Sequence, residues 1–431
     1  MPHHAFIPSN ALWAKTAPAH PQYPKIQEPL DIEFAVIGAG VTGLSTTLHL
    51  AQSGAQVALI EAYEIAHRAS GRNGGQVVPG YKPGPKALIA RFGEDAARRM
   101  MRMGYGCADT VFELIAQHQI DCSPTRNGWV QGAYSDASAR YLKHRADEIN
   151  QFGGNVAYLD KAAAAAATGS SYWPAGLLEK NAGAVQPLAY SRGLAQVARA
   201  AGAQLYEHSP VDAITSVSGG YELQVNGQRV RAKKVILATD SYTDRLWPAV
   251  AESYVTVASA QIATDPLPAA VLQALIPLRA GISETRKITY YCRIDPQGRF
   301  VIGGRGRNYD DIDATTKEQL RKAACERFPA LKDIAFTHGW ACRVGMTIDD
   351  LPHLHQLADG LWTAYGYCGR GVAMGTAMGK VLTAAAKGTA ASALDFPVTP
   401  VQRLPFYPVR QLGAAVAMQW YRLRDAMGYP G

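Results

Sequence analysis

The sequence of 431 residues predicts an α/β fold, and three observations near its beginning predict it. Residues 32–37 form a short apolar run of the kind found in a strand buried on both faces. Glycines follow at G-x-G-x-x-G spacing, and residues 41–52 then carry apolar side chains at helical spacing. A second apolar run, residues 56–60, ends at Glu61. Strand, glycine turn, helix, strand and acid in this order are typical of a unit that binds an adenine dinucleotide.

The three glycines of the turn have different physical roles. Gly38 allows the tight turn, Gly40 lets the backbone approach a pyrophosphate, and Gly43 lets helix and strand pack closely. Val41 and Thr42 begin the helix, whose free N–H groups and positive dipole end attract the same pyrophosphate. The turn therefore predicts the phosphate end of the site.

The acid at the end of the second strand predicts the ribose contact. The carboxylate of Glu61 can accept hydrogen bonds from a ribose 2′-hydroxyl and would repel a 2′-phosphate. This segment alone does not separate NAD from FAD.

Composition limits the class of protein. The chain is too long for one ordinary core, and its 48% hydrophobic and 18% charged residues are typical of a soluble globular protein. The net charge of +8 comes from dispersed basic residues, which indicates a solvated surface rather than a nucleic-acid partner. Six cysteines show no C-x-x-C pair and no metal-ligand spacing, so we expect reduced thiols, no metal site and a cytoplasmic location. No apolar run is long enough for a membrane span, and we expect no secretory signal.

The remaining elements alternate between helix and strand. The proline-rich residues 1–30 predict an extended arm rather than a helix. Periodicity predicts helices at 87–120, 137–152, 160–168 and 188–201, and strands at 203–208, 221–225, 229–232 and 234–239, followed by several strands within 254–304. The motif IGGRG at 302–306 is followed by a polar stretch instead of an apolar helix, so we predict no second nucleotide site there.

Three further segments favour a flavin over a nicotinamide. Residues 69–76, ASGRNGGQ, form a loop of glycine and small polar residues whose backbone N–H groups can approach a ring. Residues 235–243, VILATDSYT, form a strand that ends in small residues. Residues 364–380 carry three glycines before a helix, and the positive end of that helix would stabilise negative charge on the pyrimidine edge of a reduced flavin.

At these motifs the chain resembles the D-amino-acid-oxidase-type FAD-dependent oxidoreductases, and most closely their gamma-glutamylputrescine oxidase-like branch. The resemblance runs from about residue 30 to the C-terminus, through GAGVTG, SGRNGGQ, PLAYSRGLA, LATDSYT, WACRVGMTIDDLP and GYCGRGVAMG. It implies a Rossmann-type FAD-binding domain interleaved with an α+β substrate domain whose large mixed sheet covers the flavin. We expect an FAD-binding domain at 31–85, 180–247 and 337–390, a substrate domain at 86–179 and 248–336, and a C-terminal segment at 391–431 with a short helix near Trp420.

The same resemblance assigns cofactor roles to individual residues. Besides the glycine turn and Glu61, it implies FAD contacts by motif at Ser70, Arg72, Asn73, Gly74, Gly75, Gln76, Val211, Thr239, Gly369, Arg370 and Gly371. A surface ion pair is the alternative for Arg72. Relatives with a cysteine five residues before T-x-D link it covalently to the flavin, and Cys342 has that spacing here. The alternative, which we favour, is that Cys342 is a small buried residue.

The substrate side is expected to bind an amine as its free base, because a protonated nitrogen has no lone pair to assist hydride loss. Aromatic walls desolvate a cation while still attracting it, and the candidates are Tyr290, Tyr291, Trp340, Tyr365 and Tyr367. Neighbouring residues on a strand face opposite sides, so at most one of Tyr290 and Tyr291 should line the pocket.

Two arginines are candidates for a substrate anion. Glycine oxidase-like relatives clamp the substrate carboxylate with an arginine, but Arg343 lies one position early and Val344 occupies the expected place. This offset disfavours a simple α-amino acid and favours an amine whose carboxylate, if any, lies farther from the flavin. Arg305 is the second candidate, and we nominate no catalytic acid or base.

The resemblance implies FAD-dependent oxidation of a C–N bond, with hydride transfer to flavin N5 and hydrolysis of the resulting imine. We expect a small-molecule amine substrate and O2 as acceptor, which would give H2O2. Three alternatives stay open: a dehydrogenase of the same fold that reduces a quinone, an RNA-modifying flavoprotein, and a flavin-binding subunit without activity of its own.

Overall fold

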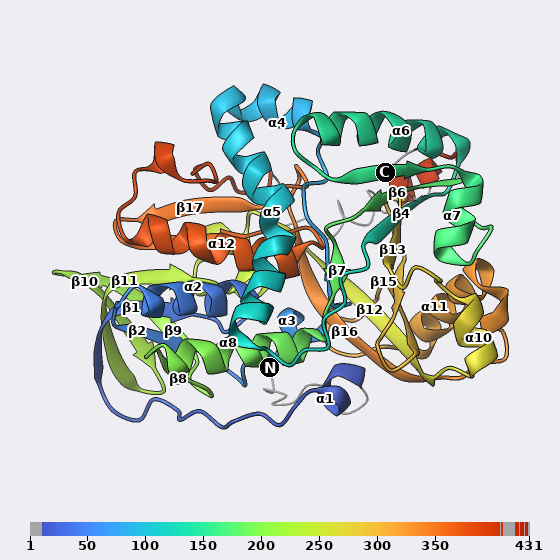
Figure 1. Cartoon of the computed structure of the whole chain (residues 1–431). Coiled ribbons are helices and arrows are strands. Elements are labelled where there is room, and N and C mark those ends of the chain that lie inside the picture. The colour runs from blue at the N-terminus through green and yellow to red at the C-terminus, as the bar shows by residue number, and fades with distance from the viewer. Residues whose placement is uncertain (1–10, 406, 408–418, 422, 426, 430–431) are drawn as a thin grey trace.

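The computed structural model describes residues 11–405, 407, 419–421, 423–425 and 427–429. Two eight-stranded sheets organise these residues (Figure 1). The chain contributes strands to the first sheet, then the second, and returns to each once or twice more, so the two sheets interleave along the sequence. This arrangement confirms the predicted α/β fold with a large mixed sheet. The predicted domain boundaries stay predictions.

The first sheet has a parallel core in the order β18-β11-β1-β2-β8. The four residues that end β1 are all buried, as the apolar run predicted. Its strands are β1 (Leu30–Ile37), β2 (Val57–Ile60), β8 (Gln204–Tyr206), β9 (Val211–Val217), β10 (Gly220–Val225), β11 (Gln228–Leu237), β17 (His353–Ala358) and β18 (Leu361–Tyr365). Figure 1 shows a helical layer on one side of this sheet, formed by α2 (Val41–Gln52), α5 (Glu94–His118), α8 (Pro187–Ala200) and α12 (Gly371–Ala386).

The second sheet has the order β16-β12-β15-β14-β13-β4-β6-β5, and its pairs are antiparallel except β13 with β4. Its strands are β4 (Trp129–Ala133), β5 (Val156–Leu159), β6 (Ala175–Glu179), β12 (Val255–Pro266), β13 (Gly281–Glu284), β14 (Tyr291–Ile294), β15 (Arg299–Arg305) and β16 (Phe336–Met346). The helices α6 (Asp136–Gln151), α7 (Lys161–Thr168), α10 (Ala269–Ala274) and α11 (Ala314–Arg327) lie around it. The face of β12 and β15 toward α11 is filled by a core that includes Ile302, Leu320 and Phe328.

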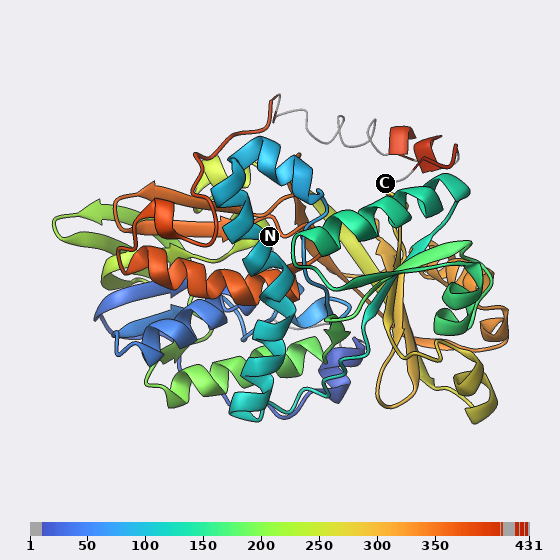
Figure 2. The same ribbon diagram turned by 45° about the horizontal axis from the view of Figure 1, so that its top comes forward.

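The remaining elements are short. They are α3 (Ala69–Arg72), β3 (Gln76–Val77), α4 (Pro85–Phe92), β7 (Gly183–Ala184), α9 (Pro248–Ala251) and the 3₁₀ turns η1 (Asp240–Tyr242), η2 (Pro329–Leu331) and η3 (Ala391–Ala393). Of the C-terminal segment, residues 419–421 and 423–425 are helical, which agrees with the predicted short helix. Asp425 accepts hydrogen bonds from the backbone N–H groups of Lys287 and Ile288, at 3.0 and 3.2 Å. This part of the chain lies beside α6 in Figure 2.

Three predicted elements differ from the structure. The arm 1–30 was expected to lack a helix, but α1 (Leu12–Thr16) forms where no proline interrupts and where Leu12 and Trp13 are buried. The helix predicted at 87–120 is two helices, because Gly93 between α4 and α5 has φ +80°. The separate strands predicted at 229–232 and 234–239 are the single unbroken strand β11. It pairs with β10 on one side and with β1 on the other.

Candidate active site

A cavity of about 2720 Å³ lies at the carboxyl ends of β1, β11 and β18 and is closed on the other side by β12 and β16. Ligands in open α/β sheets bind at this edge, outside the carboxyl ends of the parallel strands. Ordinary small-molecule pockets measure about 300–1000 Å³. This cavity is large enough for an extended dinucleotide together with a substrate.

The glycine turn forms one wall of the cavity, and the close contacts there require glycine. Gly38 follows β1 with φ +101°, and a Cβ on it would lie 2.9 Å from the carbonyl oxygen of Ala238. A Cβ on Gly43 would lie 1.9 Å from the carbonyl oxygen of Gly38, which is the helix–strand contact predicted for the third glycine. Ser70 Oγ accepts a hydrogen bond from the N–H of Val41 at 3.0 Å. Ser70 thus caps the first N–H of α2 at the wall of the cavity.

Glu61 ends β2 at the same edge. Its carboxylate accepts hydrogen bonds from the N–H groups of Ala39, at 2.7 Å, and Tyr63, at 3.0 Å. Burial raises the pKa of this carboxyl, and the two N–H donors oppose that effect. Glu61 lines the cavity, so its position fits the predicted ribose contact.

A second helix begins at the cavity. Gly369, with φ +90°, and Arg370 precede α12, and both line the cavity. Tyr367 OH and Thr42 Oγ1 lie 2.8 Å apart and connect the starts of α12 and α2. Both helices therefore direct positive dipole ends at the cavity, which suits an anionic pyrophosphate and a ring that gains negative charge. Arg370 Nη1 donates to the carbonyl oxygen of Pro79 at 2.7 Å, and burial lowers the pKa of Arg370 to about 10.

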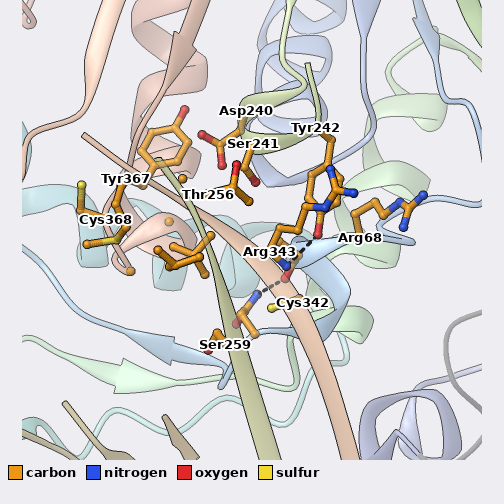
Figure 3. Close-up of a pocket in the computed structure, with 18 of the residues that line it drawn as sticks. Arg68, Asp240, Ser241, Tyr242, Thr256, Ser259, Cys342, Arg343, Tyr367 and Cys368 are labelled. Atoms are coloured by element: carbon orange, nitrogen blue, oxygen red, sulfur yellow. Dashed lines mark hydrogen bonds between the residues drawn. The ribbon is translucent and has the colours of Figure 1, made fainter. Parts of the chain in front are cut away.

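The wall opposite the glycine turn comes from the second sheet. Ser259 on β12 pairs directly with Cys342 on β16 and with Arg305 on β15, so these three side chains share one face. Ser259 Oγ lies 2.9 Å from Tyr291 OH, which places Tyr291 on this face as well. Figure 3 shows Ser259 and Cys342 below the η1 residues, among them Tyr242. The cavity thus has one wall with a glycine turn and two helix N-termini, and an opposite wall with aromatic and hydroxyl side chains.

Comparison with known proteins agrees with this geometry. The family model for FAD dependent oxidoreductases, DAO, matches residues 33–385. The chain belongs to this FAD-dependent family.

Two curated relatives match nearly the whole chain. The probable oxidoreductase OrdL of Haemophilus influenzae is 28% identical over 415 residues, which is 94% of each chain. The gamma-glutamylputrescine oxidoreductase of Escherichia coli is 28% identical over 432 residues, covering 97% of this chain and 99% of that protein. The crystal structure of glycine oxidase from Geobacillus kaustophilus superposes with a TM-score of 0.73 at 21% identity, over 86% of this chain and 99% of the other.

Most of the residues predicted to bind FAD line the cavity, and the glycine cradle fits a cofactor that approaches the backbone closely. The lining includes Gly38, Gly40, Val41, Thr42, Glu61, Ser70, Arg72, Asn73, Gly74, Gln76, Val211, Thr239, Gly369, Arg370 and Gly371. Gly43 and Gly75 lie behind this wall. A Cβ on Gly75, which has φ +71°, would lie 2.1 Å from the carbonyl oxygen of Val185.

The predicted substrate residues divide into two groups. Tyr291, Arg305, Arg343 and Tyr367 line the cavity. The lining does not include Tyr290, Trp340 and Tyr365. Each of them makes hydrogen bonds with other parts of the protein. The OH of Tyr290 accepts from Gln319 on the opposite face of the sheet, as expected for the neighbour of Tyr291.

The other two aromatic residues are buried in the frame of the site. Trp340 is fully buried and donates through Nε1 to the carbonyl oxygen of Arg72 at 2.8 Å. The OH of Tyr365 lies 3.0 Å from His355 Nε2 and accepts a hydrogen bond from Ser253. Both rings belong to buried hydrophobic clusters.

Arg343 has partners within the protein. Its guanidinium lies 3.4 Å from the carboxylate of Asp244 and 5.2 and 5.3 Å from the ring centres of Tyr242 and Tyr309. Figure 3 shows its side chain beside Tyr242. Val344 and Cys342 share the strand face toward the cavity, while Arg343 lies at the alternate position.

Cys342 is buried, and its Sγ lies 4.0 Å from the carbonyl oxygen of Arg72. Burial raises the pKa of its thiol to about 12. Because the thiolate is the nucleophile, a protonated thiol disfavours covalent attachment.

Sequence reasoning missed Asp240, Ser241 and Tyr242, which also line the cavity. Asp240 Oδ1 accepts a hydrogen bond from the N–H of Gly366 at 2.8 Å and so joins the ends of β11 and β18. Burial raises the pKa of this carboxyl. The signal was available, because an acid directly after a buried strand lies at the binding edge of the sheet.

The described residues also bear on metal binding and membrane insertion. Within the described residues, no cluster of three or more histidine, cysteine or acidic side chains is arranged to bind a metal ion. None of the described helices has the length and apolar character needed to cross a membrane.

Proposed function

We propose that this protein oxidises a C–N bond of an amine and passes the electrons to O2, which yields H2O2. FAD, when bound, would accept the two electrons that the oxidation removes from the amine. Similarity over nearly the full chain to gamma-glutamylputrescine oxidoreductase supports an amine or amino-acid-like substrate.

The cavity walls prepare the amine for oxidation. Tyr291 and Tyr367 are aromatic surfaces in the cavity, and moving an ammonium from water into such surroundings lowers its pKa. The free base then forms inside the site, while the ring faces retain affinity for the cation. Desolvation and positioning are sufficient for this step, so the proposal needs no dedicated acid or base.

The placement of the two arginines supports a particular class of amine. Arg343 is engaged by Asp244 and two tyrosine rings, and Val344 occupies the neighbouring position on the cavity face. Arg305 shares the cavity face with Ser259, two strands away from Cys342, which corresponds to about 10 Å across the sheet. Burial lowers the pKa of Arg305, and an anionic group beside it would favour the charged guanidinium.

We infer from this single observation, the position of Arg305, that the substrate carries an anionic group several bonds from the oxidised carbon. An α-amino acid, whose carboxylate adjoins the reacting carbon, fits this arrangement less well. The class is a secondary or aminoalkyl amine with a remote carboxylate.

Anaerobic bleaching of the flavin tests both parts of the proposal. The holoenzyme is mixed with amines that differ only in the presence of a remote carboxylate, and the carboxylate-bearing member of each pair should bleach the flavin at lower concentration. Arg305→Met should raise KM for that member by about 10²-fold with little change in kcat, and leave its neutral partner unaffected. Arg307→Met is the control, because Arg307 is exposed. Equal effects of Arg305→Met on both amines would contradict the inference.

Reoxidation separates the oxidase from a same-fold dehydrogenase. Turnover under O2 alone with one H2O2 per amine is expected, whereas bleaching that only a quinone reverses would overturn the oxidase assignment. The six free cysteines, of which Cys107, Cys122, Cys292, Cys342 and Cys368 are buried, support our proposal of a reducing, cytoplasm-like location.

A further inference from the structure

Three consecutive carbonyl groups of the loop after α3 are each held by a side-chain donor. The carbonyl oxygen of Arg72 accepts from Gln261 Nε2 at 2.6 Å and from Trp340 Nε1 at 2.8 Å. Trp13 Nε1 donates to the carbonyl oxygen of Asn73 at 2.8 Å. Arg293 Nε donates to the carbonyl oxygen of Gly74, also at 2.8 Å. These donors are absent from the described lining of the cavity, so they hold the loop from behind.

Trp13 is held firmly in this position although it lies far from the loop in sequence. Its side chain is 1% exposed, and its ring meets that of Trp340 edge to face at 5.6 Å. The guanidinium of Arg293 lies 5.0 Å from the Trp13 ring. Gln186 Nε2 donates to the carbonyl oxygen of Trp13 at 2.9 Å. The donor to Asn73 is therefore held by the second sheet, through Trp340 and Arg293, and by Gln186 at the start of α8.

The direction of these carbonyls sets the direction of the N–H groups. Peptide bonds in the described chain are trans, and a trans peptide unit points its carbonyl and its N–H in opposite directions. With the carbonyl of Asn73 turned toward Trp13, the N–H of Gly74 points to the other side. Gly74 lines the cavity, and a Cβ there would lie 2.8 Å from the Tyr291 ring, so nothing but backbone fits at this point.

We propose that Trp13 is a positioning residue that aims the N–H of Gly74 at the isoalloxazine ring of FAD. Reduction places negative charge on that ring, and a donor fixed in advance stabilises charge without reorganisation at the moment of reaction. Trp13 thus raises the reduction potential of the flavin from behind the loop. The inference depends on FAD binding and is independent of the amine proposed above.

The test is the midpoint potential of the holoenzyme, measured by anaerobic reduction against a reference dye with no substrate present. Trp13→Phe keeps the aromatic ring and removes the Nε1 donor. We expect the reduced form to be disfavoured about tenfold, which lowers the potential of a two-electron couple by about 30 mV. Trp362→Phe is the matched control, because Trp362 is a buried tryptophan on β18 away from the loop. It should lose stability without a change in potential.

A second variant keeps the proposal testable if Trp13→Phe fails to fold. Arg293→Lys retains the charge but loses the planar guanidinium that lies 5.0 Å from the Trp13 ring. The Trp13 donor is then held less firmly, and the potential should fall in the same direction. The inference is overturned if the midpoint potential and the visible flavin spectrum of Trp13→Phe match those of the wild type. In that case Trp13 only fills space. Arg293→Lys takes the place of Trp13→Phe if that variant does not fold.

Discussion

Replacing Gly43 by alanine should weaken FAD binding while the protein still folds. The new Cβ would lie 1.9 Å from the carbonyl oxygen of Gly38, whereas real Cβ contacts essentially never fall below 3.0 Å. Helix α2 or strand β1 must therefore move by about 1 Å, and overpacking of this kind costs about 1–3 kcal/mol. A displacement of about 1 Å in an active site costs about 10²-fold in rate. We expect a loss of the same order in affinity for a cofactor that the displaced helix contacts. We expect a folded protein whose Kd for FAD is about 10²-fold weaker.

The assay is titration of the apoprotein with FAD, together with urea unfolding of the apoprotein. Gly106→Ala is the control, because a Cβ at this position in α5 meets nothing within 4 Å. That variant should keep the Kd for FAD and gain about 0.5–1 kcal/mol in the free energy of unfolding. A wild-type Kd in Gly43→Ala would refute the argument that the third glycine positions the helix for the pyrophosphate.

Two further predictions concern buried titratable groups. Acid precipitation of the wild-type protein should leave a colourless pellet and a yellow supernatant, and Cys342→Ala should bind as much FAD per chain; a yellow pellet would show a covalent link. Burial raises the pKa of Glu179 from 4.5 to about 7, so the folded protein holds this proton more tightly than the unfolded chain. Stability should then fall by about 3 kcal/mol as pH rises through that window, and Glu179→Gln should remove this part of the fall. Urea unfolding at several pH values checks it, and identical pH dependence in both proteins would contradict the assignment.

The parts of the fold that sequence predicted are those with a local physical cause. The turn at Gly38 and the helix after it follow from one short stretch, because strand burial, glycine spacing and helical periodicity agree there. The helix α1 was missed because it depends on its surroundings, whereas the break at Gly93 has a local cause, a glycine with φ +80°, that helical periodicity did not reveal. Leu12 and Trp13 become helical where burial against distant residues stabilises so short a helix.

The site shows the same division. Residues 69–76 and 364–380 were predicted as cofactor loops because their glycines let the backbone approach a cofactor closely. Trp340 and Tyr365 lie outside the cavity lining, and residue type alone does not reveal which way a buried ring points. Arg305 was already a candidate from sequence, but its place beside Ser259 follows from strand register, which pairs residues from β12 and β15.

The hydrogen bonds that hold residues 72–74 also limit how substrate can enter the cavity and how product can leave it. Gln261, Trp340 and Arg293 belong to the second sheet, while the loop they hold belongs to the wall formed by the first. Separating the two halves about a hinge would leave these buried groups unpaired, at about 1–3 kcal/mol for each. Entry and release should therefore use surface segments at the mouth, such as residues 309–311, where Tyr309 is 39% exposed. The contacts therefore predict an enzyme whose two halves stay fixed relative to each other while substrate passes these surface residues.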